Sequence, residues 1–90
     1  MDIYPGQIVY SMAGRDKGKY FIVIEKIDEN YVYLCDGDLR KIEKPKKKKI
    51  KHIRLTGKVD RTIGEKLIAK QKVSNSEIRK SLKAMLEEVE

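Results

Sequence analysis

The chain has 90 residues, 39% of them charged, and a formal net charge of +7. This length suits one domain with a modest hydrophobic core. No apolar run approaches the length of a transmembrane helix, and the start lacks the basic and apolar regions of a signal peptide. We therefore predict a cytoplasmic protein. The excess of Lys and Arg favours a polyanionic partner, because these side chains displace counterions from phosphates. The alternative is a soluble surface with surplus lysine.

The first predicted hairpin joins two β-rich runs, Gln7–Met12 and Tyr20–Ile27, through a basic loop at residues 13–19. The runs supply the Val, Ile, Tyr and Phe that fit a pleated, half-buried surface. Gly14 and Gly18 let the loop adopt positive φ or admit another backbone. The charged residues of the loop are Arg15, Asp16, Lys17 and Lys19.

Further short strands follow. Alternation predicts a strand over Tyr31–Cys35, and Asp36-Gly37 is a hairpin signal. Asp38–Ile42 is a weaker strand candidate. Residues 50–55 predict a last strand, with a bulge or a strand end near Lys51.

Thr56-Gly57 closes the β region. Five short strands separated by turn residues predict a mainly β fold, a small barrel, over residues 1–58.

A helical extension is predicted over residues 59–90, with helices at about 62–72 and 75–89. Ser74-Asn75-Ser76-Glu77 has the pattern of a capping box at the start of the second helix. Apolar residues at helical spacing then form one face. They are Ile78, Leu82, Met85, Leu86 and Val89.

Most of the surplus charge lies in residues 40–58, where Glu43 is the single acid. The basic residues there are Arg40, Lys41, Lys44, Lys46, Lys47, Lys48, Lys49, Lys51, Arg54 and Lys58. Because Pro45 stiffens the lysine run and apolar residues flank it, we predict an ordered loop laid along a phosphate backbone. The alternatives are a solvated loop and a sheet edge whose lysines block aggregation.

The stretch around the first loop resembles a KOW motif. The matching positions are Gly6, Val9, Gly14, Lys17-Gly18 and Val23. Ser11 and Phe21 depart from the motif, since Val and Gly are usual there. The resemblance implies a small SH3-like β-barrel whose loops contact RNA.

The lysine run and residues 50–53 extend the resemblance to a KOW-containing family of large-subunit ribosomal proteins of archaea and eukaryotes, the fourteenth in its naming series. The similarity spans roughly residues 6–55. It places Gly14, Arg15, Lys17, Gly18 and Lys19 in one RNA-facing loop, and Lys47, Lys48, Lys49, Lys51 and His52 in a second contact. The helix at 74–89 has no counterpart in that family and favours a bacterial relative.

We therefore predict a non-enzymatic RNA-binding protein, associated with ribosomal RNA or the large ribosomal subunit, that grips the phosphate backbone with two basic loops. The predicted contact residues are Arg15, Lys17, Gly18, Lys19, Tyr20, Arg40, Lys41, Lys46, Lys47, Lys48, Lys49, Lys51, His52 and Arg54. Tyr20 is the preferred residue for stacking on a base. The alternative is a protein-interaction adaptor of the translation or transcription machinery that uses the barrel and the 75–89 helix.

No catalytic residue, metal site or cofactor is predicted. Cys35 is the single cysteine, which excludes an intramolecular disulfide, and it follows Leu34 in an apolar run that suits a buried thiol. His52 is the single histidine and has no recognisable catalytic partner in the sequence. Asp36 and Asp38 are explained by turn chemistry.

Overall fold

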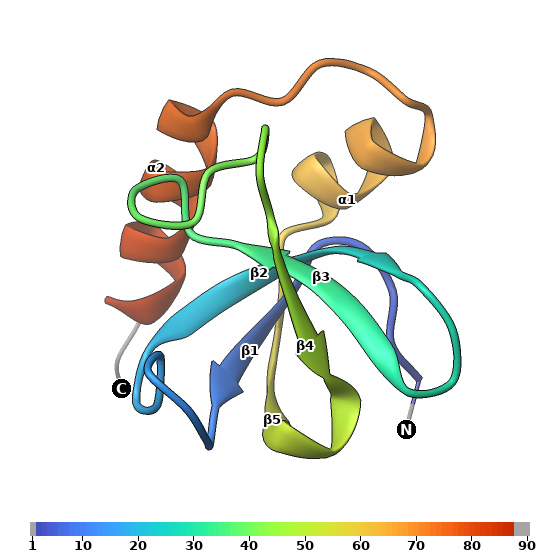
Figure 1. Ribbon diagram of the computed structural model, residues 1–90. Helices are drawn as coiled ribbons and strands as arrows, with labels where there is room; N and C mark the ends of the chain where they lie inside the picture. Colours follow the sequence, from blue (N-terminus) through green and yellow to red (C-terminus); the bar gives the residue numbers. More distant parts are fainter. Residues whose placement is uncertain (1, 88–90) are drawn as a thin grey trace.

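The computed structural model describes residues 2–87 (Figure 1). The fold is mainly β, as predicted: within these residues, five strands form one antiparallel sheet in the order β4-β3-β2-β1-β5. The elements are β1 (Gln7–Ser11), β2 (Tyr20–Lys26), β3 (Tyr31–Cys35), β4 (Lys46–Lys49), the 3₁₀ turn η1 (Ile50–His52), β5 (Ile53–Val59), α1 (Arg61–Ile68) and α2 (Asn75–Leu86).

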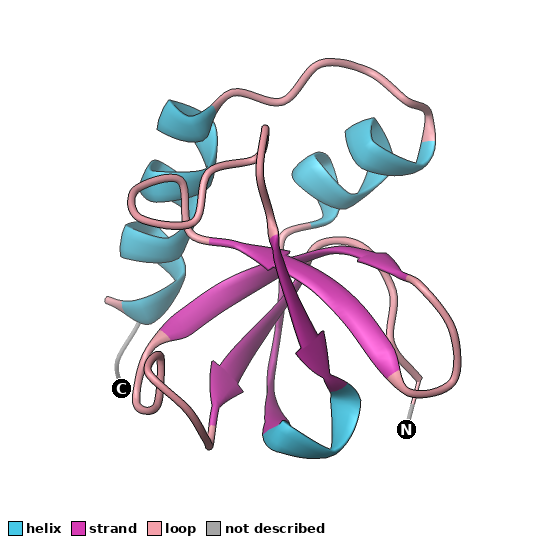
Figure 2. Ribbon diagram, in the orientation of Figure 1, coloured by secondary structure: helices cyan, strands magenta, loops and turns pink. Residues whose placement is uncertain are grey.

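The sheet is strongly curved, and β4 passes in front of the other strands (Figure 2). Alternate residues of the strands point to its inner side, as the period of two requires. Together with Ile3, which precedes β1, they form a first, buried hydrophobic cluster. Its members are Ile3, Val9, Phe21, Val23, Val32, Leu34 and Ile53.

The two helices cover the opposite side of the sheet, where a second cluster joins strands and helices. The sheet contributes Ile8, Ile22 and Cys35, and the helical part contributes Ile63, Val73, Ile78 and Leu82. The apolar stripe of α2 is therefore buried against the sheet, with Ile78 fully buried. The sheet thus has one cluster on its inner side and a second beneath the helices.

The two residues that depart from the KOW pattern both lie in the interior. Phe21 is 1% exposed and pairs with Val9 inside the curved sheet. Ser11 is fully buried, and its hydroxyl donates a hydrogen bond to the carbonyl of Ala13. Packing accommodates Phe21, and burial with a hydrogen bond accommodates Ser11.

The fourth strand was misplaced by the sequence prediction. Asp38–Ile42 is not a strand, because the Asp36 carboxylate accepts hydrogen bonds from the backbone N–H groups of Asp38 and Arg40 and fixes a turn instead. The fourth strand is the lysine run itself, Lys46–Lys49.

The last strand also differs from its prediction. Residues 50–52 form the turn η1, so the predicted strand at 50–55 is wrong in its first half, and the expected strand end near Lys51 is confirmed. Strand β5 then continues through Thr56-Gly57 to Val59.

The first helix is shorter than the predicted 62–72. It ends at Ile68, and Lys70 adopts a left-handed φ of 59° while the N–H of Gln71 bonds the carbonyl of Lys66. Asp60 caps its start by accepting from the N–H of Ile63.

The second helix begins as predicted. Its capping box is confirmed: the Ser74 hydroxyl accepts from the N–H of Glu77 at 3.1 Å, and the Glu77 carboxylate accepts from the N–H of Ser74 at 3.2 Å. The helix runs to Leu86. The end of the predicted helix, residues 88 and 89, lies outside the described residues.

A hydrogen bond joins the N-cap of α1 to α2. The Asp60 carboxylate accepts from the hydroxyl of Ser81, a buried residue of α2. Neither helix is long and apolar enough to cross a membrane, within residues 2–87.

We expect substitution of Gly37 by Ala to lower the stability of the fold strongly. Its φ is +78°, and an added Cβ would collide with the carbonyl oxygen of Asn75 and lie 3.2 Å from the N of Arg79. Gly57 is a matched control, since its φ is +86° and an added Cβ would meet nothing. We expect G57A to lower the free energy of unfolding by about 1–2 kcal/mol, because Ala at positive φ is strained. G37A should add a loss of about 1–3 kcal/mol from overpacking. Urea unfolding measures both, and equal losses would contradict this packing.

We expect the buried thiol of Cys35 to make the stability of the fold depend on pH in the alkaline range. Burial, followed by the nearby charges of Asp36 and Glu43, raises the pKa of the Cys35 thiol from 9.0 to about 12. The folded protein therefore keeps the thiol protonated where the unfolded chain loses the proton. This contribution to stability is complete below pH 9.0 and is lost as the pH rises toward 12.

We expect iodoacetamide to alkylate Cys35 far more slowly in the native protein than in urea, since the thiolate is the nucleophile. A C35A variant should lack the thiol's share of the alkaline loss of stability. Rapid alkylation of the native protein would be incompatible with a buried, protonated thiol.

Candidate nucleic-acid interface

The lysine run forms an edge strand rather than the predicted loop. In β4, Lys46 to Lys49 pair with Leu34 to Tyr31 of β3 in antiparallel register. Pro45 lies just before the strand, a position that requires no backbone donor. Main-chain pairing fixes which lysines face outward, because successive side chains of a strand point to opposite sides.

Lys48 points to the inner side and is 8% exposed. Its register partner is Val32, a member of the inner cluster, and its ammonium donates to the carbonyl oxygen of Ala13 at 2.5 Å. The aliphatic stem lies in the interior while the charged end reaches a polar group. Lys48 thus holds the β1–β2 loop against β4 and does not offer its charge to a ligand.

A buried carboxylate joins the two basic loops. Asp16 in the β1–β2 loop is 4% exposed and accepts from Nη2 of Arg40 at 3.0 Å and from Nε at 3.3 Å. Arg40 belongs to the β3–β4 loop, 24 residues away in the chain. The two segments singled out in the sequence therefore meet, and Asp16 neutralises much of the Arg40 charge.

Helix α2 holds the β3–β4 loop from its other side. Arg79 donates to the carbonyl of Gly37 at 2.6 Å. The Asn75 amide accepts from the N–H of Ile42 at 2.8 Å and donates to the carboxylate of Glu43 at 2.8 Å. This last bond lowers the pKa of Glu43 below its ordinary value. The conformation of the basic loop thus depends on the helical extension, which no sequence signal had indicated.

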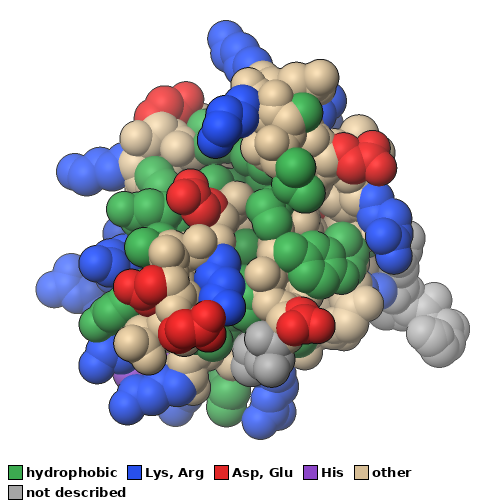
Figure 3. Space-filling view, turned by 90° about the vertical axis from the view of Figure 1, so that its right-hand side faces the viewer, with side chains coloured by type: hydrophobic (Ala, Val, Ile, Leu, Met, Phe, Trp, Pro, Cys, Tyr) green, Lys and Arg blue, Asp and Glu red, His purple; other side chains and the backbone are tan. Residues whose placement is uncertain are grey.

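The outward cations lie on neighbouring loops and on β4. The exposed predicted residues are Arg15, Lys17 and Lys19 in the β1–β2 loop, Lys41 in the β3–β4 loop, Lys47 and Lys49 in β4, Lys51 in η1, and Arg54 in β5. Figure 3 shows Lys and Arg side chains along its left-hand edge, the side of β4, while acidic and apolar side chains share the middle of this face.

A hollow of about 500 Å³ adjoins the upper end of β4 and has no acidic residue in its lining. It is lined by Leu39, Arg40, Lys41, Lys44, Pro45, Lys46 and Lys47. Lys44 is exposed and was absent from the predicted contacts. A concave surface with several cations is suited to a phosphate group.

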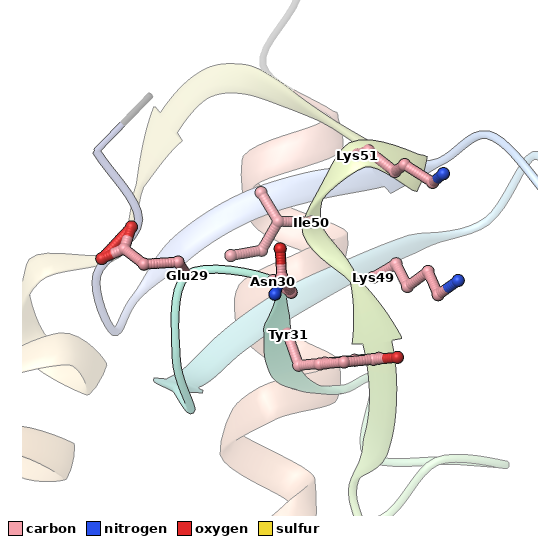
Figure 4. A pocket seen from close by; sticks show the side chains of 6 residues that line it. All are labelled: Glu29, Asn30, Tyr31, Lys49, Ile50 and Lys51. Carbon is pink, nitrogen blue, oxygen red and sulfur yellow. The ribbon is translucent and has the colours of Figure 1, made fainter.

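Aromatic side chains accompany the cations. Tyr31 lies directly opposite Lys49 across the strand pair, and the Nζ of Lys47 lies 4.6 Å from the centre of the Tyr31 ring, a cation–π geometry. A hollow of about 430 Å³ borders this ring; its lining residues are Glu29, Asn30, Tyr31, Lys49, Ile50 and Lys51 (Figure 4). Tyr31 is absent from the predicted contacts, because its place beside the lysines depends on the pairing of β3 with β4.

Tyr20, the preferred stacking residue, lies at the start of β2 and is 39% exposed. Its ring centre lies 5.2 Å from that of Tyr10, and both border a hollow with Arg54. The β1–β2 loop is adjacent, since Gly18 lies close to the Tyr10 hydroxyl. This forms a second, smaller aromatic and basic cluster.

His52 is half-buried in η1, and its carbonyl accepts from the N–H of Met12 at 2.8 Å. Among residues 2–87, no group of three or more His, Cys, Asp and Glu side chains is arranged to hold a metal ion. The chain matches no protein-family model, and no curated protein matches it significantly.

The contact between Asp16 and Arg40 predicts measurable coupling. In a double-mutant cycle with D16N and R40Q, we expect a coupling energy of about 1–3 kcal/mol, because the carboxylate is buried and accepts two hydrogen bonds. The exposed pair Lys26–Glu29, at 3.4 Å, is the matched control. Its cycle should give about 0.5 kcal/mol or less. Denaturant unfolding supplies the four free energies of each cycle, and equal coupling in both cycles would contradict the assigned role of Asp16.

Proposed function

We propose that this protein is a non-enzymatic RNA-binding module built on an SH3-like barrel of the KOW type. The strand order β4-β3-β2-β1-β5, with one turn of 3₁₀ helix between β4 and β5, supports that fold type. The β1–β2 loop folds over β4 through Lys48 and supports closure of the barrel. Ribosomal RNA as the partner, and the cytoplasm as the location, stay predictions.

The observation that carries the proposal is the outward face of β4. Lys47 and Lys49 alternate with an inward Lys48, so main-chain pairing directs both side chains to one side of the sheet. Rigid placement lowers the entropic cost of ordering lysines on a phosphate backbone. Phosphate contacts supply most of the affinity and make it dependent on salt.

The assigned contacts are a revision of the predicted set. The exposed lysines of β4, η1 and the β1–β2 loop form the surface, with Lys41 and Lys44 beside it. Lys48 and Arg40 position this surface through Ala13 and Asp16.

The adaptor alternative has less support. It required an exposed apolar face on the second helix, but Ile78 is fully buried and Leu82 is 8% exposed. The face of α2 that would bind a partner is occupied by the sheet. The nuclease experiment below tests whether a protein partner binds the barrel without the helix.

We expect K47E with K49E to weaken binding to structured RNA by about tenfold or more at moderate salt, since two phosphate contacts become repulsive. The matched control is K80E with K83E, which makes the same change in net charge at exposed positions of α2. This control should bind within about twofold of the wild type if contact rather than net charge decides the affinity.

Filter binding over a series of salt concentrations gives both affinities and slopes. Replacing Lys47 and Lys49 by Gln should reduce the steepness of the plot of log K against log salt by about 1.4 to 1.8. Equal weakening by the two Glu pairs would refute a β4 interface. A pull-down with this protein as bait provides the second test. Recovery of one partner protein after nuclease treatment, together with no RNA binding by the filter assay, would favour the adaptor.

A further inference from the structure

We propose that the β3–β4 face binds an unpaired strand of RNA, with one base in the hollow beside Tyr31 and phosphates on Lys47, Lys49 and Lys51. This inference rests on the proposed RNA binding and specifies its ligand. It adds contact with a base to the phosphate contacts predicted for the basic loops.

The lysine spacing fits a single extended backbone. Lys47 and Lys49 are two residues apart in a strand and therefore about 6.6 Å apart along it, comparable to the distance between successive phosphates of an unpaired strand. Figure 4 shows that the side chains of Lys49 and Lys51 extend toward the same side of the molecule. Three cations thus form a row along one edge.

Tyr31 supplies an aromatic surface next to this row. Its side chain extends to the same side as those of Lys49 and Lys51, below the hollow (Figure 4). Lys47 already lies 4.6 Å from the ring centre, so a bound base would join an existing cation–π pair. Stacking on such a ring tolerates any base, because every base has a π face.

Tyr33 is a poorer candidate, although it also faces outward opposite Lys47. Glu25 pairs with Tyr33 on the neighbouring strand, which places an acidic residue beside that ring. Glu29 lines the hollow beside Tyr31, but its carboxylate lies 3.4 Å from Lys26 and extends to the side opposite Lys49 and Lys51 in Figure 4.

The polar residues around the hollow indicate on which side of it the phosphates and the base would lie. Glu29 extends to the side opposite the lysines in Figure 4, and its charge repels phosphates from that rim. Asn30 lies between the two rims, and its amide can both donate to and accept from a base edge. We therefore place the base inside the hollow and the phosphates on the lysine side.

A duplex cannot make this set of contacts. Its base faces are covered by stacking, so an aromatic side chain has no free base to stack on, and paired RNA is recognised through phosphates and shape. An aromatic surface within a row of cations is the combination that binds single strands.

The test measures fluorescence anisotropy with two labelled RNAs, a short oligouridylate and a hairpin duplex of the same charge. We expect the wild type to prefer the unpaired strand at equal salt. Y31L should weaken binding to the oligouridylate by about tenfold and change binding to the duplex by about twofold or less. Y31F keeps the ring and should retain the affinity.

Y4L is the matched control, because Tyr4 is 41% exposed and borders α1 rather than β4. Equal affinity of the wild type for both RNAs would overturn this inference, and that comparison does not depend on the folding of any variant. Full binding by Y31L, together with loss of binding in K47E/K49E, would also overturn it and leave the proposed function intact. Failure of the wild type to bind either RNA, or equally tight binding of polyglutamate, would overturn the proposed function itself.

Discussion

The pairing of β4 with β3 is the constraint on which the candidate site depends. A strand of four lysines repels itself, yet here each residue has a place in an antiparallel ladder. The ladder forces alternate side chains to opposite sides, and the inward Lys48 satisfies its charge on the carbonyl of Ala13. The ladder thereby leaves Lys47 and Lys49 facing outward, and the Lys48 bond holds the β1–β2 loop against β4. A slip by one residue would turn Lys47 and Lys49 inward and Lys46 and Lys48 outward.

The helical extension has a structural role in this surface. Ile78 and Leu82 complete the second cluster behind the sheet, and Asn75 and Arg79 hold the β3–β4 loop by hydrogen bonds. The loop carries cations close together, which repel one another and need such support to adopt one conformation. The helix that the KOW resemblance did not explain is thereby connected to the basic face through the loop after Gly37.

The charges of the two basic segments are not equivalent. Asp16 neutralises Arg40 and Ala13 accepts from Lys48, so the residues that build the surface differ from those that present charge to a ligand. Three of the outward cations, Lys47, Lys49 and Lys51, lie near Tyr31, and the Nζ of Lys47 is 4.6 Å from the centre of its ring. Under the proposed RNA binding, a count of lysines therefore exceeds the number of lysines available for phosphate contacts.

The sequence by itself determined the mainly β fold, the first hairpin, the capping box at Ser74 and the two basic segments, because these follow from local alternation, turn residues and hydrogen bonds between near neighbours. The tertiary structure decided what local patterns cannot encode. The lysine run is a strand because its backbone pairs with that of β3. Asp38–Ile42 is instead held in a turn by the Asp36 carboxylate. Only contacts distant in the chain distinguish the buried Lys48 from its exposed neighbours, since four identical side chains carry no signal of their direction. Tyr31 was brought beside them by the same long-range pairing.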